Sequence, residues 1–275
     1  MASQKRIAVL MPAYNPGSEI GLTLDSLRAQ TVPFKLFVID DGSARKPDYA
    51  ALLKGFDHHL ILSPRNLGVN EARNPALQKI LDEGFDYIAL IDCGDVCMPE
   101  RLAVQGAFLD ANPGIAIVGS NVELVYGPER QNAILKFPET PEGVRRSMLS
   151  IMPVSHPALM IRSEVFRTIG LYSSRFEAAE DYDMIRRADR AGFAITNLHE
   201  ILVRKIETSE SISVKKRDKQ LRSRLAIQRH YMDWVNPVAW KGLARTAALI
   251  VTPYKWVMAL KGPAHRFHKT NVFWI

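Results

Sequence analysis

The first part of the chain alternates short apolar runs with amphipathic stretches. Residues 7–12 (IAVLMP) are apolar throughout, and residues 19–30 repeat apolar side chains at the three- and four-residue spacing of a helix. Residues 34–40 (FKLFVID) return to a short run rich in β-branched and aromatic side chains. This order predicts a strand, a helix and a second strand, which is the unit of helix-covered parallel sheets.

The same alternation continues to about residue 95. We expect a helix at 48–56, a strand at 58–63, a helix at 69–83 and a strand at 86–92. The sequence therefore predicts an α/β domain with a mostly parallel sheet and helices on both faces.

The pattern loses its regularity after about residue 113. Residues 115–127 are expected to form a strand that bends into a second one, before a helix at 143–150 and a strand at 156–162. Residues 163–170 and 178–192 then show helical patterns. From residue 209 the chain becomes polar and basic, and this change is the best candidate for a boundary.

The composition is that of a soluble globular protein. Of the 275 residues, 47% are hydrophobic and 24% are charged, so a substantial core is expected. The apolar run near the N-terminus is too short for a secretory signal, and we interpret it as the first strand. The two cysteines, Cys93 and Cys97, have no partner pair elsewhere, which argues against a disulfide framework or a zinc site and favours a reducing cytoplasm.

Positive charge is concentrated in the tail. The formal net charge is +7, and residues 215–230 (KKRDKQLRSRLAIQRH) form a basic stretch that is predicted to be helical. Trp234, Trp240, Tyr254 and Trp256 then alternate with lysines and arginines, which is typical of an element on an anionic membrane surface. A helical pair packed back on the domain is an equal alternative. Because charged residues and a proline interrupt the tail, we expect no membrane-crossing helix.

Polar side chains gather where the predicted strands end. They are Asn15, Asp40, Asp41, Arg65, Asn66, Asp92 and Asp95. Ligands of open α/β sheets bind at the carboxyl ends of the strands, so we expect the binding site there.

Four motifs occur in order within residues 5–205. They are Pro12-Ala13-Tyr14-Asn15, Val38-Ile39-Asp40-Asp41-Gly42-Ser43, Asn66-Leu67-Gly68 with Ala72-Arg73-Asn74, and Glu180-Asp181-Tyr182-Asp183. Each motif is weak alone, but together and in this order they resemble family 2 of the glycosyltransferases. The resemblance implies a GT-A fold, which is a Rossmann-like α/β domain, and an inverting enzyme that uses a nucleotide-sugar donor.

The resemblance also implies which residues bind the nucleotide sugar. Asp40 would contact the base, with Asp41 in support, and the loop 12–15 would face the base and ribose. Arg65, Asn66, Arg73 and Asp92 would complete the donor side. Turn chemistry is an even alternative for the aspartate pair, and a solvated surface charge is the commoner fate of a lone arginine.

A departure from the family pattern falls in its metal-binding acidic motif. Asp92 takes the first acidic position, Gly94 falls where the metal-coordinating aspartate is usual, and Asp95 is an extra carboxylate. Asp92 and Asp95 would hold Mg²⁺ or Mn²⁺ if Gly94 permits a local backbone shift. A helix-capping role explains Asp95 equally well.

A second departure concerns a histidine that often approaches the metal in this family. The chain has Ile206 at that place, within Val203-Arg204-Lys205-Ile206-Glu207. Two altered positions indicate either rearranged metal binding or neutralisation of the diphosphate by Arg204 and Lys205.

The acidic pair Glu180-Asp181 carries the hypothesis about catalysis. Inversion by direct displacement needs one carboxylate that takes the proton of the attacking hydroxyl, and the resemblance implies Asp181 for this role. Glu180 would position the acceptor or the base, and His156 is a minor candidate on the acceptor side. Without the upstream motifs, a structural role would be the better explanation of the pair, because acidic side chains in the first turn of a helix interact favourably with the helix dipole.

The sequence thus predicts a transferase domain over residues 1–208 and a helical tail over 209–275. Within the domain, about 1–112 would hold the nucleotide sugar and 113–208 the acceptor. We expect a sugar to pass from a nucleoside diphosphate sugar, with a UDP-sugar as the expected donor, to a saccharide or lipid-linked saccharide acceptor in lipopolysaccharide or exopolysaccharide assembly. The protein would be cytoplasmic and could lie on the inner membrane surface through its tail.

Three other functions are less consistent with the sequence. A catalytically silent nucleotide-sugar-binding or scaffold protein would explain Gly94 and Ile206. A nucleotidyltransferase would need a glycine-rich, lysine-containing loop after the first strand, which the chain lacks. Nucleic acid is not an expected partner, because the net positive charge resides in the tail and no known module is recognisable.

Overall fold

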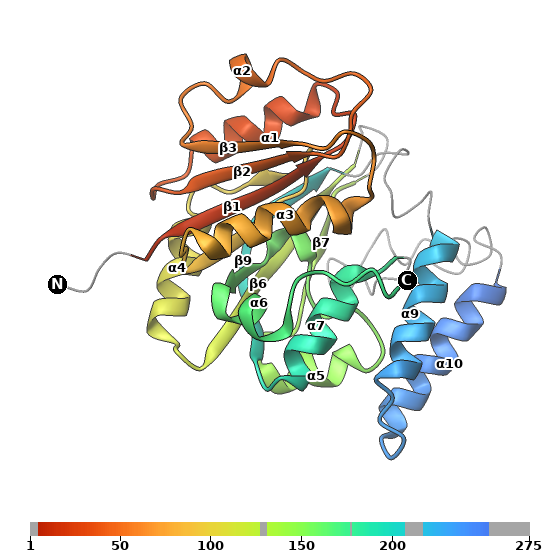
Figure 1. Cartoon of the computed structure of the whole chain (residues 1–275). Coiled ribbons are helices and arrows are strands. Elements are labelled where there is room, and N and C mark those ends of the chain that lie inside the picture. Colours follow the sequence, from red (N-terminus) through yellow and green to blue (C-terminus); the bar gives the residue numbers. More distant parts are fainter. Residues whose placement is uncertain (1–4, 127–130, 177, 207–216, 253–275) are drawn as a thin grey trace.

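A computed structural model of the chain describes residues 5–126, 131–176, 178–206 and 217–252 (Figure 1). Tyr254 and Trp256 of the aromatic tail, and the expected boundary near residue 209, lie outside these ranges.

The first half of the central sheet is parallel. β1 (Ile7–Ala13), β2 (Lys35–Asp40), β3 (His58–Leu62) and β4 (Tyr87–Leu90) lie in the order β3-β2-β1-β4. The carboxyl ends of these strands therefore meet at one edge, as the alternation in the sequence predicts.

The second half of the sheet is mixed. β8 (Met160–Arg162) is antiparallel to both β4 and β6 (Ile115–Val125), and β6 is parallel to β9 (Ala194–Ile206). The short strands β5 (Val96–Cys97) and β7 (Ala133–Leu135) pair antiparallel with β9 and β6. The expectation of a mostly parallel sheet thus describes only the first half.

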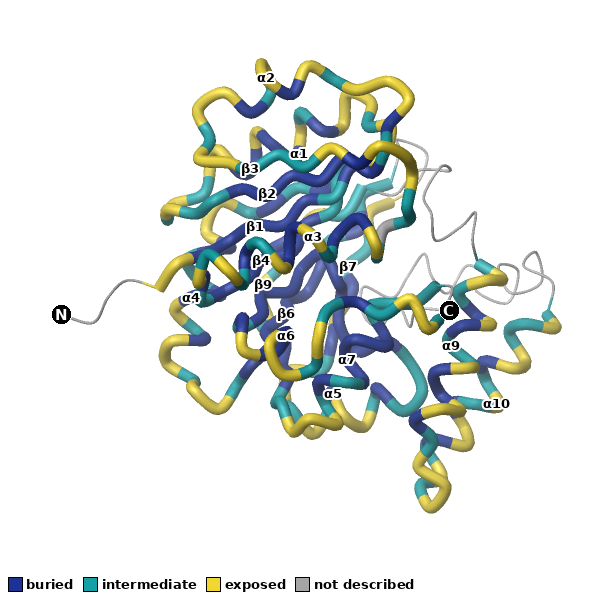
Figure 2. The backbone as a smooth tube through the Cα atoms, in the orientation of Figure 1, coloured by how far each residue is buried: buried dark blue, intermediate teal, exposed yellow. Residues whose placement is uncertain are grey.

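Helices cover both faces of the sheet (Figure 1). One face packs against α1 (Glu19–Arg28), α2 (Tyr49–Leu52) and α4 (Arg101–Ala111). The other face packs against α3 (Val69–Asp82), α5 (Pro141–Met148), α6 (Ser163–Ile169) and α7 (Glu180–Arg190). Neighbouring residues of a strand enter opposite cores, as Phe37 and Val38 of β2 do. Because both faces are buried at the centre of the sheet (Figure 2), the central strands β1 and β4 are apolar throughout.

Three elements differ from the sequence expectation. Residues 115–125 form the single long strand β6, whose pairing with β9 absorbs the expected bend as register shifts. Residues 156–158 form a 3₁₀ turn before β8, because Pro157 cannot donate to a strand ladder. Helix α2 spans only Tyr49–Leu52, and Asp48 caps it by accepting a hydrogen bond from the Ala51 amide.

The described part of the tail contains two helices, α9 (Arg217–His230) and α10 (Pro237–Val251), and the pair packs on the domain beside α7 (Figure 1). Gln228 donates to the Ser150 carbonyl, and a Cβ added to Gly242 would lie 2.4 Å from the Leu149 carbonyl oxygen. The packed pair expected as one alternative is therefore present, although one face of α10 is exposed. None of the described helices is both long and apolar enough to cross a membrane.

Candidate active site

Two loops at the ends of β1 and β2 hold each other in place. Ser43 Oγ accepts a hydrogen bond from the Asn15 amide at 2.7 Å, and Asn15 Oδ1 accepts one from the Ala44 amide at 2.8 Å. Asn15 adopts a φ of 45°, which is uncommon without a glycine. The end of the expected loop 12–15 is thus fixed by hydrogen bonds between backbone amides and side-chain oxygens. The Tyr14 side chain in this loop is 54% exposed.

Asp40 is fully buried at the end of β2. Its two carboxylate oxygens accept hydrogen bonds from the Ser43 amide and the Tyr49 hydroxyl, each at 2.7 Å. Burial and this hydrogen bond raise the pKa of Tyr49. Asp40 therefore shapes the loop, and its expected contact with a nucleotide base stays a prediction.

Asp41 connects the same loop to the start of α3. Its two oxygens accept hydrogen bonds from the amides of Leu67 and Gly68, at 2.7 and 3.0 Å. Directly after the two aspartates, Gly42 has a φ of 71°, and a Cβ there would lie 2.1 Å from the Arg65 carbonyl carbon. Only glycine fits this contact. The side chains of Arg65 and Asn66, which the sequence suggested for the donor side, are exposed.

Arg73 is the buried cation of the site. Its Nη2 donates to Asp92 Oδ1 at 3.0 Å, and its Nη1 lies 3.6 Å from Glu180 Oε1. Burial opposes ionisation of Asp92, but Arg73 and other nearby cations outweigh it and hold the pKa of this carboxyl below its ordinary value. Arg73 therefore joins the end of β4 to the start of α7.

His156 and Tyr172 form a buried pair next to Arg73. His156 Nε2 lies 2.6 Å from the Tyr172 hydroxyl, and the Arg73 guanidinium lies 5.7 Å from the centre of the Tyr172 ring. Burial and Arg73 lower the pKa of His156 to about 4. The imidazole is therefore neutral at pH 7, and it can exchange one hydrogen bond with Tyr172 but adds no charge.

The acidic pair lies at the N-terminus of α7. Ala179, the residue before the acidic pair, has a φ of 61°, in the left-handed region. This backbone conformation costs about 1–2 kcal/mol for a residue other than glycine. Such local strain is common at functional sites. Burial and the neighbouring Asp181 raise the pKa of Glu180, while Arg73 opposes the rise. Asp181 is half-buried, and its Oδ1 accepts a hydrogen bond from the Tyr182 amide at 2.7 Å.

The residues at the expected metal position do not form a set of metal ligands. Gly94 has a φ of 101°, its amide donates to Thr23 Oγ1, and a Cβ there would lie 3.4 Å from Glu19 Cγ. Asp95 Oδ1 accepts a hydrogen bond from the Ile206 amide, and Asp92 binds Arg73. Within the described ranges, no three histidine, cysteine, aspartate or glutamate side chains converge on a possible ion. These residues do not fit the expected metal.

The two cations suggested for the diphosphate occupy different surroundings. Arg204 Nε donates to Glu123 at 2.7 Å on the outer part of β9. Lys205 is close enough to Asp92 and His156 to lower the pKa of both groups. Only Lys205 therefore belongs to the charged cluster.

The structure brings one group of the expected residues together. Asp92, His156, Glu180 and Asp181 surround Arg73, whereas Asp40 and Asp41 turn their carboxylates toward neighbouring loops. Sequence reasoning missed Tyr172, which contacts both His156 and Arg73. It also missed Tyr49 and Thr23. No motif marked these residues, because their partners are distant in the sequence.

Comparisons with known proteins agree with the motifs. A family model described as glycosyl transferase family 2 matches residues 8–170, more than half of the chain. The amylovoran biosynthesis glycosyltransferase AmsE of Erwinia amylovora is 22% identical over 228 residues, which cover 81% of this chain and 84% of AmsE. Some relatives are longer: the chain spans 65% of the glycosyltransferase AglE of Haloferax volcanii and 20% of the y4gI protein of Sinorhizobium fredii.

Solved structures confirm the fold expected from the resemblance. TarS of S. aureus, residues 1–349 in complex with UDP-GlcNAc, has a TM-score of 0.63 and 17% identity, covering 86% of this chain and 71% of that one. The mannosyltransferase PcManGT of Pyrobaculum calidifontis, in complex with GDP-Man and Mn²⁺, has a TM-score of 0.61 and 15% identity, covering 98% of this chain and 82% of that one. At these identities the likeness shows the fold alone.

Proposed function

Because this chain belongs to glycosyl transferase family 2, we propose that it transfers a sugar, with inversion, from a nucleoside diphosphate sugar to an acceptor hydroxyl. The observation that carries the proposal is the arrangement of Glu180 and Asp181 at the start of α7, facing Arg73 and Asp92. Carboxylates from opposite halves of the domain meet there around the buried Arg73.

Asp181 is the proposed general base. It accepts the proton of the acceptor hydroxyl while that oxygen bonds to the anomeric carbon of the donor sugar. The bond between this carbon and the diphosphate oxygen breaks, and the nucleoside diphosphate leaves with the bonding electron pair. Glu180, held by Arg73, positions the acceptor beside the base.

The donor side is proposed at the ends of β1, β2 and β4. The rigid loops around Asn15 and Asp41 would shape the space for the base and ribose. A UDP-sugar is the proposed donor, supported by the fold shared with TarS, whose complex contains UDP-GlcNAc. Residues 1–112 would form this nucleotide half and residues 113–208 the acceptor half.

Lys205 is proposed to compensate the charge of the leaving diphosphate. Its charge acts on Asp92 at the end of β4, close to where a donor diphosphate would reach the acidic pair. A fixed cation costs no reorganisation as negative charge develops. Lys205→Met is expected to weaken UDP binding at least tenfold and to leave uridine binding unchanged, because uridine carries no diphosphate. Equal weakening of both ligands would overturn this role.

Substitution of the base tests the proposed reaction directly. Asp181→Asn is expected to lower sugar transfer by about 10²- to 10⁴-fold, while UDP affinity is retained. Asp189→Asn, on the same helix but paired with Arg145, is the matched control and should keep full turnover. Unchanged transfer in Asp181→Asn would remove the residue from its role. Nucleotide binding without turnover in the wild type would favour the silent nucleotide-sugar-binding protein.

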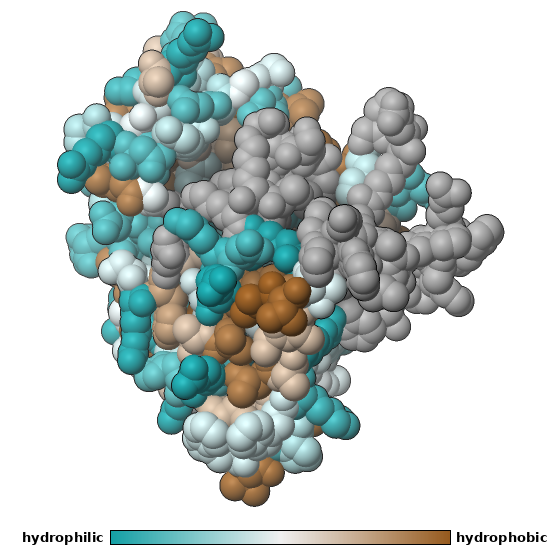
Figure 3. All heavy atoms as spheres, turned by 90° about the vertical axis from the view of Figure 1, so that its right-hand side faces the viewer, coloured by the Kyte–Doolittle hydropathy of each residue, from teal (hydrophilic) through white to brown (hydrophobic). Residues whose placement is uncertain are grey.

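The acceptor is proposed to be a lipid-linked saccharide at a membrane surface, in the assembly of a cell-surface polysaccharide. The name of AmsE, a relative in amylovoran biosynthesis, supports the polysaccharide context. The exposed residues of α10 support the membrane context. They are Pro237, Trp240, Lys241, Ala244, Ala247, Ala248 and Val251. This face is apolar with one cation (Figure 3), and no acidic residue follows Asp233 in the sequence.

Flotation with anionic vesicles tests the membrane proposal. Trp240, 48% exposed, is changed to Glu, and the control is Leu22→Glu on α1, where the leucine is 52% exposed. Because only Trp240 belongs to the proposed surface, Trp240→Glu is expected to reduce vesicle binding several-fold while Leu22→Glu binds like the wild type. Equal flotation of both variants would count against α10 as the membrane surface.

A further inference from the structure

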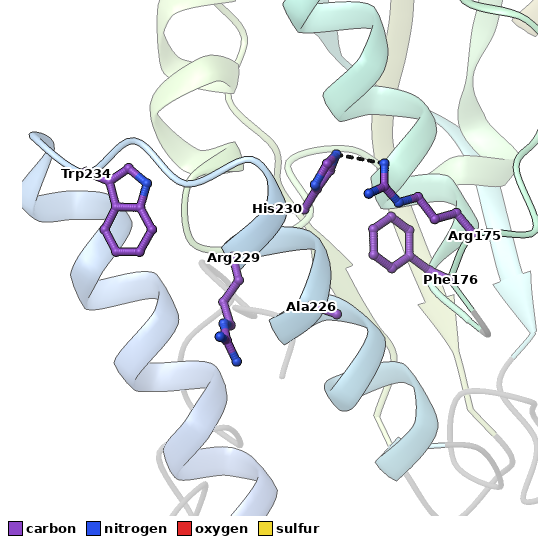
Figure 4. A pocket seen from close by; sticks show the side chains of 6 residues that line it. All are labelled: Arg175, Phe176, Ala226, Arg229, His230 and Trp234. Carbon is purple, nitrogen blue, oxygen red and sulfur yellow. Dashed lines mark hydrogen bonds between the residues drawn. The ribbon is translucent and has the colours of Figure 1, made fainter.

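An open pocket of about 440 Å³ lies between α9 and the loop that leads into α7 (Figure 4). The loop contributes Arg175 and Phe176, and α9 with the turn after it contributes Ala226, Arg229, His230 and Trp234. Pockets of this volume hold small-molecule ligands.

Two arginines and a histidine line the pocket, and no acidic side chain among the described residues lines it. Arg175 Nη1 donates to His230 Nε2 at 3.0 Å, so the imidazole accepts from the guanidinium and orients it (Figure 4). Among the described residues, no carboxylate forms a hydrogen bond or ion pair with Arg175, Arg229 or His230. Planar guanidinium groups bind phosphate oxygens well, and Arg175 keeps N–H donors beyond the one that His230 accepts.

The walls of the pocket are aromatic and continue onto the exposed face of α10. Phe176 packs near the His230 ring, with the ring centres 6.2 Å apart. At the other end, Trp234 is 66% exposed and contacts Trp240 with ring centres 5.5 Å apart. A cationic centre is thus joined to an apolar surface, which matches an amphiphile with a phosphate head and a hydrocarbon chain.

The pocket is coupled to the start of α7 through hydrogen bonds. Ala178, in the loop between Arg175 and the acidic pair, donates its amide to Ser223 Oγ of α9. The Tyr231 hydroxyl donates to Asp183 Oδ1, and Arg186 donates to the Tyr231 carbonyl. A ligand head held in this pocket would therefore lie beside the loop that positions Asp181.

We propose that this pocket binds the phosphate or diphosphate group of a lipid-linked acceptor, whose hydrocarbon chain leaves past Trp234 toward α10. This inference rests on the proposed glycosyl transfer and adds a recognition site for the phosphate of the acceptor. The attached sugar would extend from the phosphate toward Asp181.

Calorimetric titration of the full-length protein tests the pocket, with UDP present at saturation so that diphosphate probes cannot enter the donor site. The probes are farnesyl diphosphate, farnesol and inorganic diphosphate. Farnesyl diphosphate is expected to bind at least tenfold more tightly than either of the others. Equal binding of farnesol would overturn phosphate recognition, and equal binding of inorganic diphosphate would overturn a lipid source in favour of a soluble phosphorylated ligand.

Variants place the binding in the pocket. Arg175→Gln and Arg229→Gln are each expected to weaken farnesyl diphosphate binding at least tenfold. Arg146→Gln, at an exposed position on α5, is the control and should bind like the wild type. Because Arg229 is exposed and its side chain forms no hydrogen bond to any residue in the described ranges, Arg229→Gln should fold normally, which unfolding curves check. Wild-type affinity in Arg229→Gln would overturn the proposal.

The same data separate this inference from the proposed function. A protein that binds UDP and transfers sugar, yet binds no farnesyl diphosphate, overturns only the pocket. A protein whose pocket binds farnesyl diphosphate, but which transfers no sugar from any nucleotide donor, overturns only the glycosyl transfer.

Discussion

Arg73 on α3 and Glu180 on α7 form an ion pair of 3.6 Å, and the same guanidinium donates to Asp92 on the far side of the site. The cation lowers the cost of placing Glu180, Asp181 and Asp92 close together. Without it, three carboxylates would repel one another in a partly buried space, and one of them would take up a proton.

Arg73→Met is therefore expected to raise the pKa of Glu180 further, because the cation that most opposes the effects of burial and Asp181 would be lost. The acid limb of the kcat/KM profile should move to higher pH, and kcat/KM at pH 7 should fall at least tenfold. Arg73→Lys should recover only part of this loss, since an ammonium group cannot span both carboxylates. A pH–rate profile of each variant measures the shift.

The matched control is Arg145→Met. Arg145 also pairs with a carboxylate of α7, Asp189, but in a solvent-exposed position, where such pairs contribute little. It should keep the wild-type profile. A profile that is unchanged in Arg73→Met as well would show that the ion pair does not control Glu180.

The sequence predicts the parts of this site that depend on local patterns. Asp92 follows a short apolar strand and Glu180 begins an amphipathic helix, so both positions can be inferred from hydrophobic periodicity. The family resemblance then gives these residues a role. The GT-A fold follows from the same two kinds of information, and the comparisons confirm it.

Contacts between distant segments could not be predicted in this way. Tyr172 exchanges two hydrogen bonds with Asn74, and the order of a single chain does not encode such a pairing. β8 is only three residues long, and its place between β4 and β6 comes from sheet geometry. The orientation of Asp40 toward Tyr49 likewise depends on how α2 packs against the sheet.

A second prediction concerns His156 and the pH dependence of the free energy of unfolding. Its pKa is lowered from 6.5 to about 4 in the folded protein, so between these pH values the unfolded chain binds more protons. Acidification therefore favours unfolding. Between pH 7 and pH 4.5, the titration of His156 should lower the free energy of unfolding by roughly 2–3 kcal/mol. His156→Gln, which cannot titrate, should reduce the pH dependence of the unfolding free energy by that amount.

Urea unfolding at the two pH values measures the effect of His156. His58→Gln, at an exposed position on β3, is the control and should retain the full wild-type dependence. The groups facing His156 are Tyr172, Arg73, Asp92, Asp181 and Lys205. If His156→Gln keeps the wild-type pH dependence, the imidazole is not the group whose protonation destabilises the fold.

Gly42 tests the rigidity of the proposed donor loop. Gly42→Ala would force a Cβ into the Arg65 backbone at a φ of 71°, whereas Gly55→Ala has a φ of 88° and open space around it. Gly55→Ala should lower the free energy of unfolding by about 1–2 kcal/mol, through backbone strain alone. Gly42→Ala should cost at least about 2 kcal/mol more through overpacking. It should also weaken UDP binding, as calorimetry would detect; equal stability of the two variants would refute the close contact.

Gly242 tests whether the packing of α10 supports the acidic pair. Gly242→Ala improves helix propensity by up to about 1 kcal/mol, but its Cβ would lie 2.4 Å from the Leu149 carbonyl oxygen. We expect the collision to dominate, because overpacking costs about 1–3 kcal/mol and the backbone at Leu149 cannot rotate away. Gly21→Ala, in α1 with nothing within 4 Å, should show the propensity gain alone.

Displacement of α10 should also reach the site. Since α9 packs on α10 and holds the Ala178 amide and Asp183 by hydrogen bonds, Gly242→Ala should lower kcat as well as stability. Chemical unfolding and transfer kinetics of the two glycine variants measure both effects. A Gly242→Ala protein that is as stable and as active as Gly21→Ala would show that the added Cβ is accommodated and that the close packing of Gly242 on Leu149 does not support the acidic pair.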